Sequence, residues 1–506
     1  MKKILIALLA LGTLTAQAQQ NTLLQAAFWQ AAPTVDAVKA EVAKGNNPSQ
    51  SNGNSFDPVV LAINANAPTS TIQYLIEQPG NDVNKLTHDG RIYLHWAASR
   101  GNAELVEYLL KKGSKLDLFD THGSTPLLFA ANGGQQNTKI YDSFLAHGAN
   151  FKKDLNQDGA NVLLLAIAND KNFALTDYFV SKGVDLNSVD NNGNNAFAYA
   201  ARTGNVEFLK ALVQKGVKPN ANAMLMAAQG GGGRGAAQAG TGVAVFEYLE
   251  SVGIKPTAIA KNGENVLHAI ARKPNQAEQI KYFLSKGVSV NQVNEDGNNV
   301  LMAAAAANRD IAALELLVPQ VKNINQPNQA GQTALTLAVK GNSPEVVSYL
   351  ISKGADVKVL DKKGNNLAFY AVESYRGAGG RGPAMGGGAG NQDFDNKLSV
   401  LKQNGLDIAA PQKDGNTLYH LAVAKNDLNL VKKVEALGIN INAKNSEGIT
   451  PLHKAALIAK DDVMLKYLLS INAKKDEVTN FKETAFDLAS ENETLSKNKV
   501  VITFLK

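Results

Sequence analysis

The sequence predicts an all-α protein: an α-solenoid of about 14 stacked helix-turn-helix repeats joined by short β-hairpin fingers. Three observations predict this fold class. One pattern returns about every 34 residues along nearly the whole chain, most copies place a good capping residue before a helix, and most place a glycine after one. Because a stacked array grows without enclosing a new core, a chain of 506 residues needs no second kind of domain.

The pattern is clearest as Gly-x-Thr-x-Leu-x-x-Ala, and its glycine defines a register for the chain. We call this residue the register glycine, and its clearest copies begin at Gly123, Gly331, Gly415 and Gly448. Counted from this residue or its replacement, the register falls at Gln20, Ser55, Gly90, Gly123, Gly159, Gly193, Ala221, Gly263, Gly297, Gly331, Gly364, Gly415, Gly448 and Lys482.

The copy at Gly331 illustrates the elements that we expect in each repeat. A turn ends at Gly331, and the hydroxyl of Thr333 then suits a helix N-cap. A short helix that buries Leu335 should end near Gly341, and a second helix should end at Gly354. Other copies place a capping residue at the same position: Thr125, Asn161, Asn195, Asn265, Asn299, Asn366, Thr417, Thr450 and Thr484. Proline follows this position at Pro126 and Pro451 and begins the corresponding helix at Pro58, where a missing N–H costs little.

In this order of turn, helix, helix and extended return, the chain resembles the ankyrin repeat over almost its whole length. The resemblance implies antiparallel helix pairs with projecting hairpin fingers, stacked into a curved array that binds protein partners. It also implies a structural role for four histidines at one repeat position, whose rings would hydrogen-bond neighbouring loops: His95, His268, His420 and His453. Trp96 lies on a helix face that holds leucine in other copies, so we expect it in the core.

The chain divides into a leader, two end caps and the array between them. Met1–Ala18 has the charged start, apolar stretch and small-residue cleavage site of a secretory signal peptide, with a retained interfacial anchor as the alternative. We expect an N-terminal capping repeat at 19–54, an array at 55–481 and a C-terminal capping repeat at 482–506. The leader predicts export, to the periplasm or, alternatively, out of the cell.

Two glycine-rich insertions interrupt the array, at 230–242 and 376–391. Both match Gly-x-Gly-x-x-Gly, but the nucleotide-binding motif needs a preceding buried strand, and these segments follow helices. We interpret both as surface loops between the two helices of a repeat, serving as plain linkers or as contacts for a partner.

The sequence lacks the residue patterns of a catalytic or metal site. The absence of cysteine excludes disulfides, zinc-thiolate sites and a cysteine nucleophile, and no serine-hydrolase or zinc-protease motif occurs. The net charge of +6 is spread along the chain. We therefore predict a non-enzymatic monomer without a cofactor, without a nucleic-acid partner and without membrane insertion after cleavage.

Our leading hypothesis is a scaffold that binds a partner protein along its concave repeat surface. The alternatives are an accessory or protective factor of an exported enzyme, an enzyme whose site is built across repeats, and a purely structural spacer. Candidate partner-binding residues lie on the finger tips and in the two arginine-bearing insertions: Lys85, His88, Asp89, Phe119, His122, Arg234, Asn294, Glu295, Arg376, Arg381 and Lys444.

Overall fold

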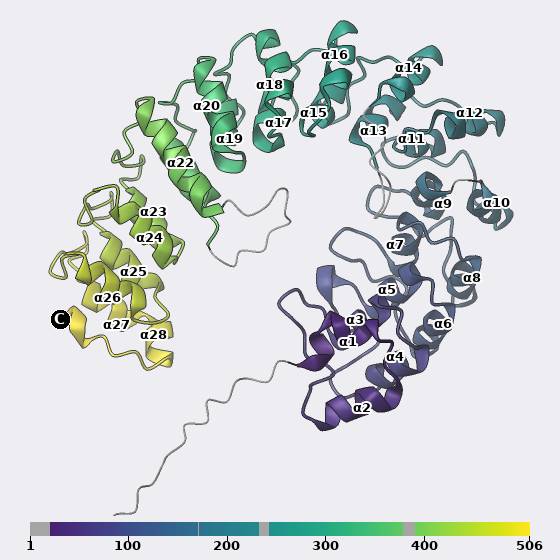
Figure 1. Cartoon of the computed structure of the whole chain (residues 1–506), viewed down its shortest axis with the longest axis horizontal. Coiled ribbons are helices and arrows are strands. Elements are labelled where there is room, and N and C mark those ends of the chain that lie inside the picture. The colour runs from purple at the N-terminus through teal and green to yellow at the C-terminus, as the bar shows by residue number, and fades with distance from the viewer. Residues whose placement is uncertain (1–20, 171, 232–241, 378–389) are drawn as a thin grey trace, which may run out of the picture. The chain divides into compact units, whose positions relative to one another are not determined.

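The computed structural model describes residues 21–170, 172–231, 242–377 and 390–506, and Figure 1 shows their helices in chain order. The predicted leader and most of both glycine-rich insertions lie outside these ranges. The chain forms two compact units: Met1–Ala223 with Gly230–Ala239, and Met224–Gln229 with Gly240–Lys506. Each unit is described by itself.

The predicted all-α fold is confirmed, with 28 α-helices arranged as 14 pairs in the described ranges. The first unit contains α1 (Ala26–Gln30), α2 (Val35–Ala43), α3 (Pro58–Asn64), α4 (Thr69–Ile76), α5 (Tyr93–Arg100), α6 (Ala103–Lys111), α7 (Pro126–Asn132), α8 (Thr138–Ala146), α9 (Val162–Ala166), α10 (Ala174–Ser181), α11 (Ala196–Ala201) and α12 (Val206–Gln214). The second unit contains α13 (Ala223–Gln229, apart from its first residue), α14 (Ala244–Ser251), α15 (Val266–Ala271), α16 (Ala277–Ser285), α17 (Val300–Ala307), α18 (Ile311–Leu317), α19 (Ala334–Gly341), α20 (Pro344–Ser352), α21 (Leu367–Ser374), α22 (Gly390–Gln403), α23 (Leu418–Ala424), α24 (Leu428–Glu435), α25 (Pro451–Ile458), α26 (Val463–Ser470), α27 (Ala485–Glu491) and α28 (Glu493–Lys497). Short 3₁₀ turns lie at Thr22–Leu24, His88–Gly90, Ile167–Asn169, Val318–Gln320 and Thr503–Leu505.

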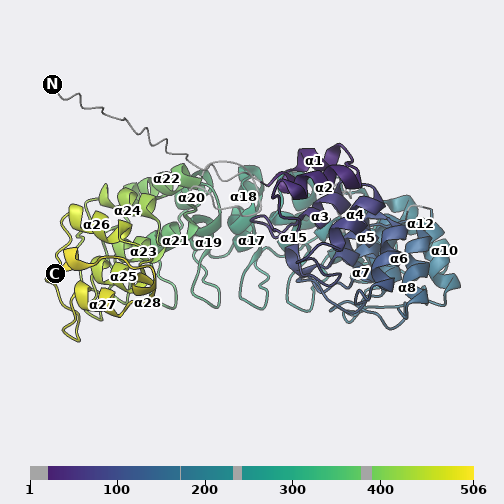
Figure 2. The same cartoon turned by 90° about the horizontal axis from the view of Figure 1, so that it is seen from below.

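Within each unit the first helices of successive pairs pack on one another, and second helices also pack on second helices. In the second unit α19 contacts both α17 and α21, while α20 contacts α22 (Figure 2). The side chains between them are fully buried, among them Leu335, Val347 and Leu350. Trp96 is also buried, which confirms it as a core residue.

The predicted capping residues determine where the first helices begin. All ten stand at the N-cap of the first helix of a pair, as Asn299 does, where its side-chain oxygen accepts a 2.9 Å hydrogen bond from the Met302 N–H. Pro58, Pro126 and Pro451 begin their helices, as expected. Asp57 caps α3 in the same way, although the sequence pattern did not single it out.

The carbonyl groups that end a first helix are satisfied by a side chain from the following repeat. Asn342 donates to the carbonyls of Ala305 (2.9 Å) and Asn308 (2.8 Å) at the end of α17. In the repeat with the longer insertion, the buried Lys397 of α22 donates to the Val339 carbonyl of α19 at 2.9 Å. Burial lowers the pKa of this amine to about 8. These bonds lock the ends of successive helix pairs together because a buried, unpaired carbonyl would be costly.

The fingers are tight turns, and no regular strand occurs in the described ranges. Two fingers carry an isolated antiparallel bridge, Ile259 with Asn265 and Val293 with Asn299. In many fingers the side chain three positions before the register glycine closes the turn, as Asp361 does by accepting from the N–H groups of Lys363 and Asn365, both at 2.8 Å. One such turn is too short for a ladder of strand hydrogen bonds. Figure 2 shows the fingers projecting from one side of α15, α17 and α19.

Backbone hydrogen bonds connect consecutive finger tips. The Lys362 N–H donates to the Ala330 carbonyl at 2.9 Å, and the Ser446 N–H donates to the Asp414 carbonyl at 2.9 Å. Gly331 has a φ of +81°, and a Cβ at this position would lie 2.6 Å from the Lys362 nitrogen. The register glycine therefore supplies a left-handed turn and room for the next finger.

The four histidines at the shared repeat position connect neighbouring fingers, as the resemblance implied. Nδ1 of His95 accepts from the Ile92 N–H at 3.2 Å, and Nε2 donates to the Ser124 carbonyl of the next finger at 3.1 Å. His268, His420 and His453 make the same pair of contacts, and all four rings are buried. Burial lowers the pKa of each ring, in His95 to about 4.

We predict that a methyl group at Gly331 costs more stability than one at Gly354. Both residues have a positive φ, which costs about 1 kcal/mol for alanine, but a Cβ at Gly354 would meet nothing within 4 Å. At Gly331 the clash with the next finger should cost a further 1 kcal/mol or so. Urea denaturation of Gly331→Ala and Gly354→Ala measures the difference, and equal midpoints would contradict the contact between fingers.

We predict that acid destabilises the fold through the buried histidines. The unfolded chain takes up a proton on His95 below its ordinary pKa of about 6.5, whereas the folded ring stays neutral down to about pH 4. The stability from this ring is complete above pH 6.5 and is lost as the pH falls toward 4, by about 2 kcal/mol at pH 5. Urea denaturation at pH 7.5 and pH 5 should show a smaller difference for His95→Gln than for the wild type.

The control repeats the comparison of His95→Gln with the wild type at pH 7.5 and pH 9. Because the His95 ring is neutral in both the folded and the unfolded chain over this range, the difference between the two proteins should stay constant. Identical pH dependence in His95→Gln and the wild type would contradict the role given to burial.

Candidate functional site

The ammonium group of Lys85, a candidate partner-binding group, is used inside the first unit. It lies 2.8 Å from the carboxylate of the fully buried Asp57 and donates to the Ser49 carbonyl and the Asn81 side chain, both at 2.9 Å. The Tyr93 hydroxyl donates to the same carboxylate at 2.7 Å. Burial raises the pKa of this phenol, and the charge of Asp57 adds to the increase. Lys85 therefore balances a buried charge.

Three other candidates lie together on two consecutive finger tips. A carboxylate oxygen of Asp89 is 3.4 Å from Nε2 of both His88 and His122, and 3.0 Å from the guanidinium of Arg91. Partial burial opposes ionisation of Asp89, but the neighbouring positive groups outweigh it and lower the pKa of the carboxyl. His88 is further held by Phe56, whose ring centroid is 4.5 Å away. The cluster is an interaction between fingers with part of its surface in solvent.

Arg91 anchors this cluster, and the sequence analysis did not select it. Its side chain is buried, lies 2.9 Å from the Asp120 carboxylate and stacks over the rings of Phe129 and Trp96 at 4.5 and 5.2 Å. Its repeat position could have indicated it, because Arg91 is the one arginine that directly follows a register residue in this chain.

Some of the remaining candidates have partners within the protein, and others are exposed to solvent. Asn294 shapes its own turn by accepting from the N–H groups of Asp296 (3.1 Å) and Asn298 (2.9 Å). Lys444 forms a 2.8 Å ion pair with Glu477. Glu295 and Arg376 are exposed, and so is Phe119. Arg234 and Arg381 lie outside the described residues.

Phe119 belongs to a repeated feature of the finger surface. More than half of the large apolar side chains that are exposed in the described ranges stand four residues before the register residue. They are Leu86, Phe119, Leu155 and Val189 in the first unit, and Ile259, Leu360 and Val478 in the second. Scattered exposed apolar residues are ordinary, whereas their recurrence at one repeat position marks a candidate contact surface. We call these residues the apolar finger position.

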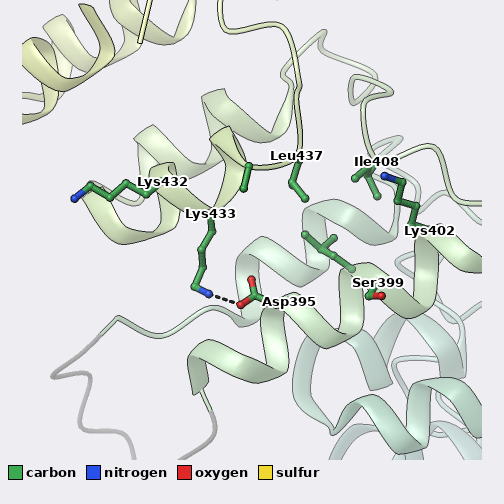
Figure 3. Close-up of a pocket in the computed structure, with 9 residues that line it drawn as sticks. Asp395, Ser399, Lys402, Ile408, Lys432, Lys433 and Leu437 are labelled. Carbon is green, nitrogen blue, oxygen red and sulfur yellow. Dashed lines mark hydrogen bonds and ion pairs between the residues drawn. The ribbon is translucent and has the colours of Figure 1, made fainter. Parts of the chain in front are cut away.

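A cavity of about 550 Å³ lies between α22 and α24 in the second unit (Figure 3). Leu398, Ile408 and Leu437 provide apolar walls, and Lys402, Lys432 and Lys433 add positive charge. Lys433 is paired with Asp395, as the dashed line in Figure 3 shows, and Lys432 lies over the ring of Tyr467 at 5.5 Å. The size of this cavity is typical of small-ligand sites. Of its three lysines, however, only Lys402 has no ion pair or ring contact among the described residues.

Within the described ranges, no group of three or more histidine or acidic side chains could hold a metal ion. None of the helices there is long and apolar enough to cross a membrane.

Comparison with known proteins identifies the repeat. Residues 59–154, 135–223 and 304–379 match the family model of ankyrin repeats, which together is just under half of the chain. An ankyrin repeat protein of fowlpox virus is 32% identical over 158 residues, which cover 30% of this chain and 41% of the viral protein.

In two other relatives the aligned segment is a small part of the whole protein. The human transient receptor potential cation channel subfamily A member 1 is 32% identical over 129 residues, which cover 25% of this chain and 11% of the channel. An L-asparaginase of Dirofilaria immitis is 28% identical over 144 residues, which cover 28% of this chain and 24% of that protein. The chain spans less than half of each of these relatives. The matched segments are thus similar to ankyrin repeats, and the 14 helix pairs of the described ranges are the arrangement expected of an ankyrin-type solenoid.

Proposed function

We propose that this protein is a non-enzymatic scaffold that binds a partner protein on its repeats. The observation that supports it most is the recurrence of exposed apolar side chains at the apolar finger position, on fingers that backbone hydrogen bonds hold in register. A surface made of such positions is already organised before binding, so little conformational entropy is lost when a partner docks.

Several of the polar residues that could serve chemistry are used within the fold. The buried histidines connect fingers, and the pairs around Asp57 and Asp89 balance charges within the first unit. Because these side chains already have partners within the protein, a binding function is favoured over catalysis. Ankyrin repeats generally bind proteins, which supports the same proposal, and the identity of the partner is left to experiment.

We predict that a photo-crosslinking amino acid at the apolar finger position captures one partner protein in cells. The test places it at Phe119 and, separately, at Leu360, both exposed. Mass spectrometry of the adducts should recover the same partner repeatedly, and an exported enzyme as that partner would support an accessory role. Val213, exposed on the second helix α12, is the matched control and should give no adduct. Recovery of no partner from either finger would contradict the proposal.

We further propose that the protein works after export, because Met1–Ala18 has the pattern of a secretory leader. Fusion of residues 1–40 to alkaline phosphatase, which folds only in an oxidising compartment, should produce active phosphatase. An inactive fusion that stays in the cytoplasm would contradict export and leave the binding proposal intact.

A further inference from the structure

Four exposed lysines and one exposed apolar residue lie on two consecutive fingers of the second unit. Leu360, at the apolar finger position, is 60% exposed. Lys358, Lys362 and Lys363 are exposed on the same finger, and Lys413 is exposed on the next one. We call these five residues the lysine patch. Exposed prolines occupy the apolar finger position on the two adjacent fingers, at Pro327 and Pro411.

The ammonium groups of these lysines are available to a partner. Among the described residues, none of the four has an ion pair or hydrogen bond through its side chain, whereas Lys85 and Lys444 on other fingers are both paired with carboxylates. The carboxylate of Asp361, on the same finger, accepts from the Tyr370 hydroxyl and the Asn365 amide. Partial burial opposes its ionisation, but these hydrogen bonds outweigh it and lower the pKa of Asp361. The exposed carboxylate of Asp414, beside Lys413, accepts from the backbone and side-chain amides of Asn416.

Rigid backbone contacts hold the patch in place. The Lys362 N–H is bonded to the Ala330 carbonyl at 2.9 Å, and the Lys413 N–H to the Gly364 carbonyl at 3.2 Å. A Cβ on Gly364 would lie 2.4 Å from the Cβ of Lys413, so the two fingers touch directly. The positions of the charges are therefore set by the stacked turns, and mainly the long lysine side chains must order on binding.

We propose that the lysine patch binds an acidic polypeptide segment that carries a large apolar side chain. Charge complementarity selects the carboxylates, and Leu360 with Pro327 and Pro411 offers the apolar contact. A nucleic acid fits less well, since its phosphates would contact the lysines but leave the exposed Leu360 and the two prolines without an apolar partner. This inference rests on the proposed scaffold function and specifies one of its surfaces.

The test measures binding of three fluorescent probes to the full chain by anisotropy. One probe is a 12-residue Glu/Asp peptide with a central leucine, the second has serine in place of that leucine, and the third is a heparin oligosaccharide. We expect the leucine peptide to bind at least about tenfold more tightly than the serine peptide, and its affinity to fall as salt rises. Equal binding of the two peptides would overturn the proposal.

Variants separate the two parts of the patch. Lys362→Gln/Lys363→Gln/Lys413→Gln should weaken the leucine peptide at least about tenfold, and Leu360→Ser should weaken it about tenfold while leaving the serine peptide unchanged. Matched controls remove the same charge or apolar surface elsewhere in the second unit: Lys281→Gln/Lys340→Gln/Lys460→Gln and Leu457→Ser. All of these side chains are exposed, so thermal unfolding should stay at the wild-type temperature and report any loss of fold.

The outcomes distinguish this inference from the scaffold function. If the lysine variant weakens heparin and both peptides equally and Leu360→Ser changes nothing, the patch is a general polyanion site and the inference is overturned. If the patch variants still capture the cellular partner at Phe119 and bind the leucine peptide normally, the inference fails and the scaffold function stands. If the leucine peptide binds as expected but no cellular partner is recovered, the patch stands as a peptide site and the scaffold function fails.

Discussion

The contact between one finger turn and the next is the constraint on which the rest of this protein depends. In most fingers a left-handed register residue closes the turn and leaves room for the next finger, as Gly331 does next to Lys362. That contact sets the register in which consecutive helix pairs bury their apolar faces. It also brings the ring of His95 to the Ser124 carbonyl and the side chain of Asn342 to the end of α17, so that polar groups at the helix ends are paired inside the stack.

The same constraint explains how the chain can tolerate variation within its repeats. The second helices carry a recurring clasp in which a tyrosine donates to a carboxylate of the preceding repeat, as Tyr282 does to Glu250 at 2.8 Å, with Lys286 paired to the same carboxylate. Where the insertion at 376–391 separates α21 from α22, the side chain of Lys397 in α22 still reaches the end of α19. Different side chains thus connect neighbouring repeats at different places along the chain. This is expected when each repeat touches only its neighbours.

Most of the fold could be predicted from the sequence because its signals are local. A threonine or asparagine at Thr333 or Asn299 caps a helix through its own side chain, and a glycine at Gly354 ends one through its own backbone. The fingers were less predictable, since a single closed turn at Asp361 carries the residue pattern of a hairpin without enough length for strands. Among the candidate site residues, Phe119 is exposed, whereas Lys85 is committed to Asp57, a partner that lies 28 residues earlier in the chain.

The sequence by itself determined the helix pairs, their caps and their number, because each depends on residues within one repeat. Only the tertiary structure decided which polar side chains are already used and which remain for a partner. Lys85 and Lys362 are both finger lysines, five and two residues before their register glycines, and the sequence does not show which of them is used by the fold. The first neutralises a buried carboxylate, whereas the side chain of the second has no ion pair or hydrogen bond among the described residues. Lys413 joins Lys362 because a finger 51 residues later in the sequence stacks directly on its own. Such proximity arises from stacking between repeats, and no local pattern of residues encodes it.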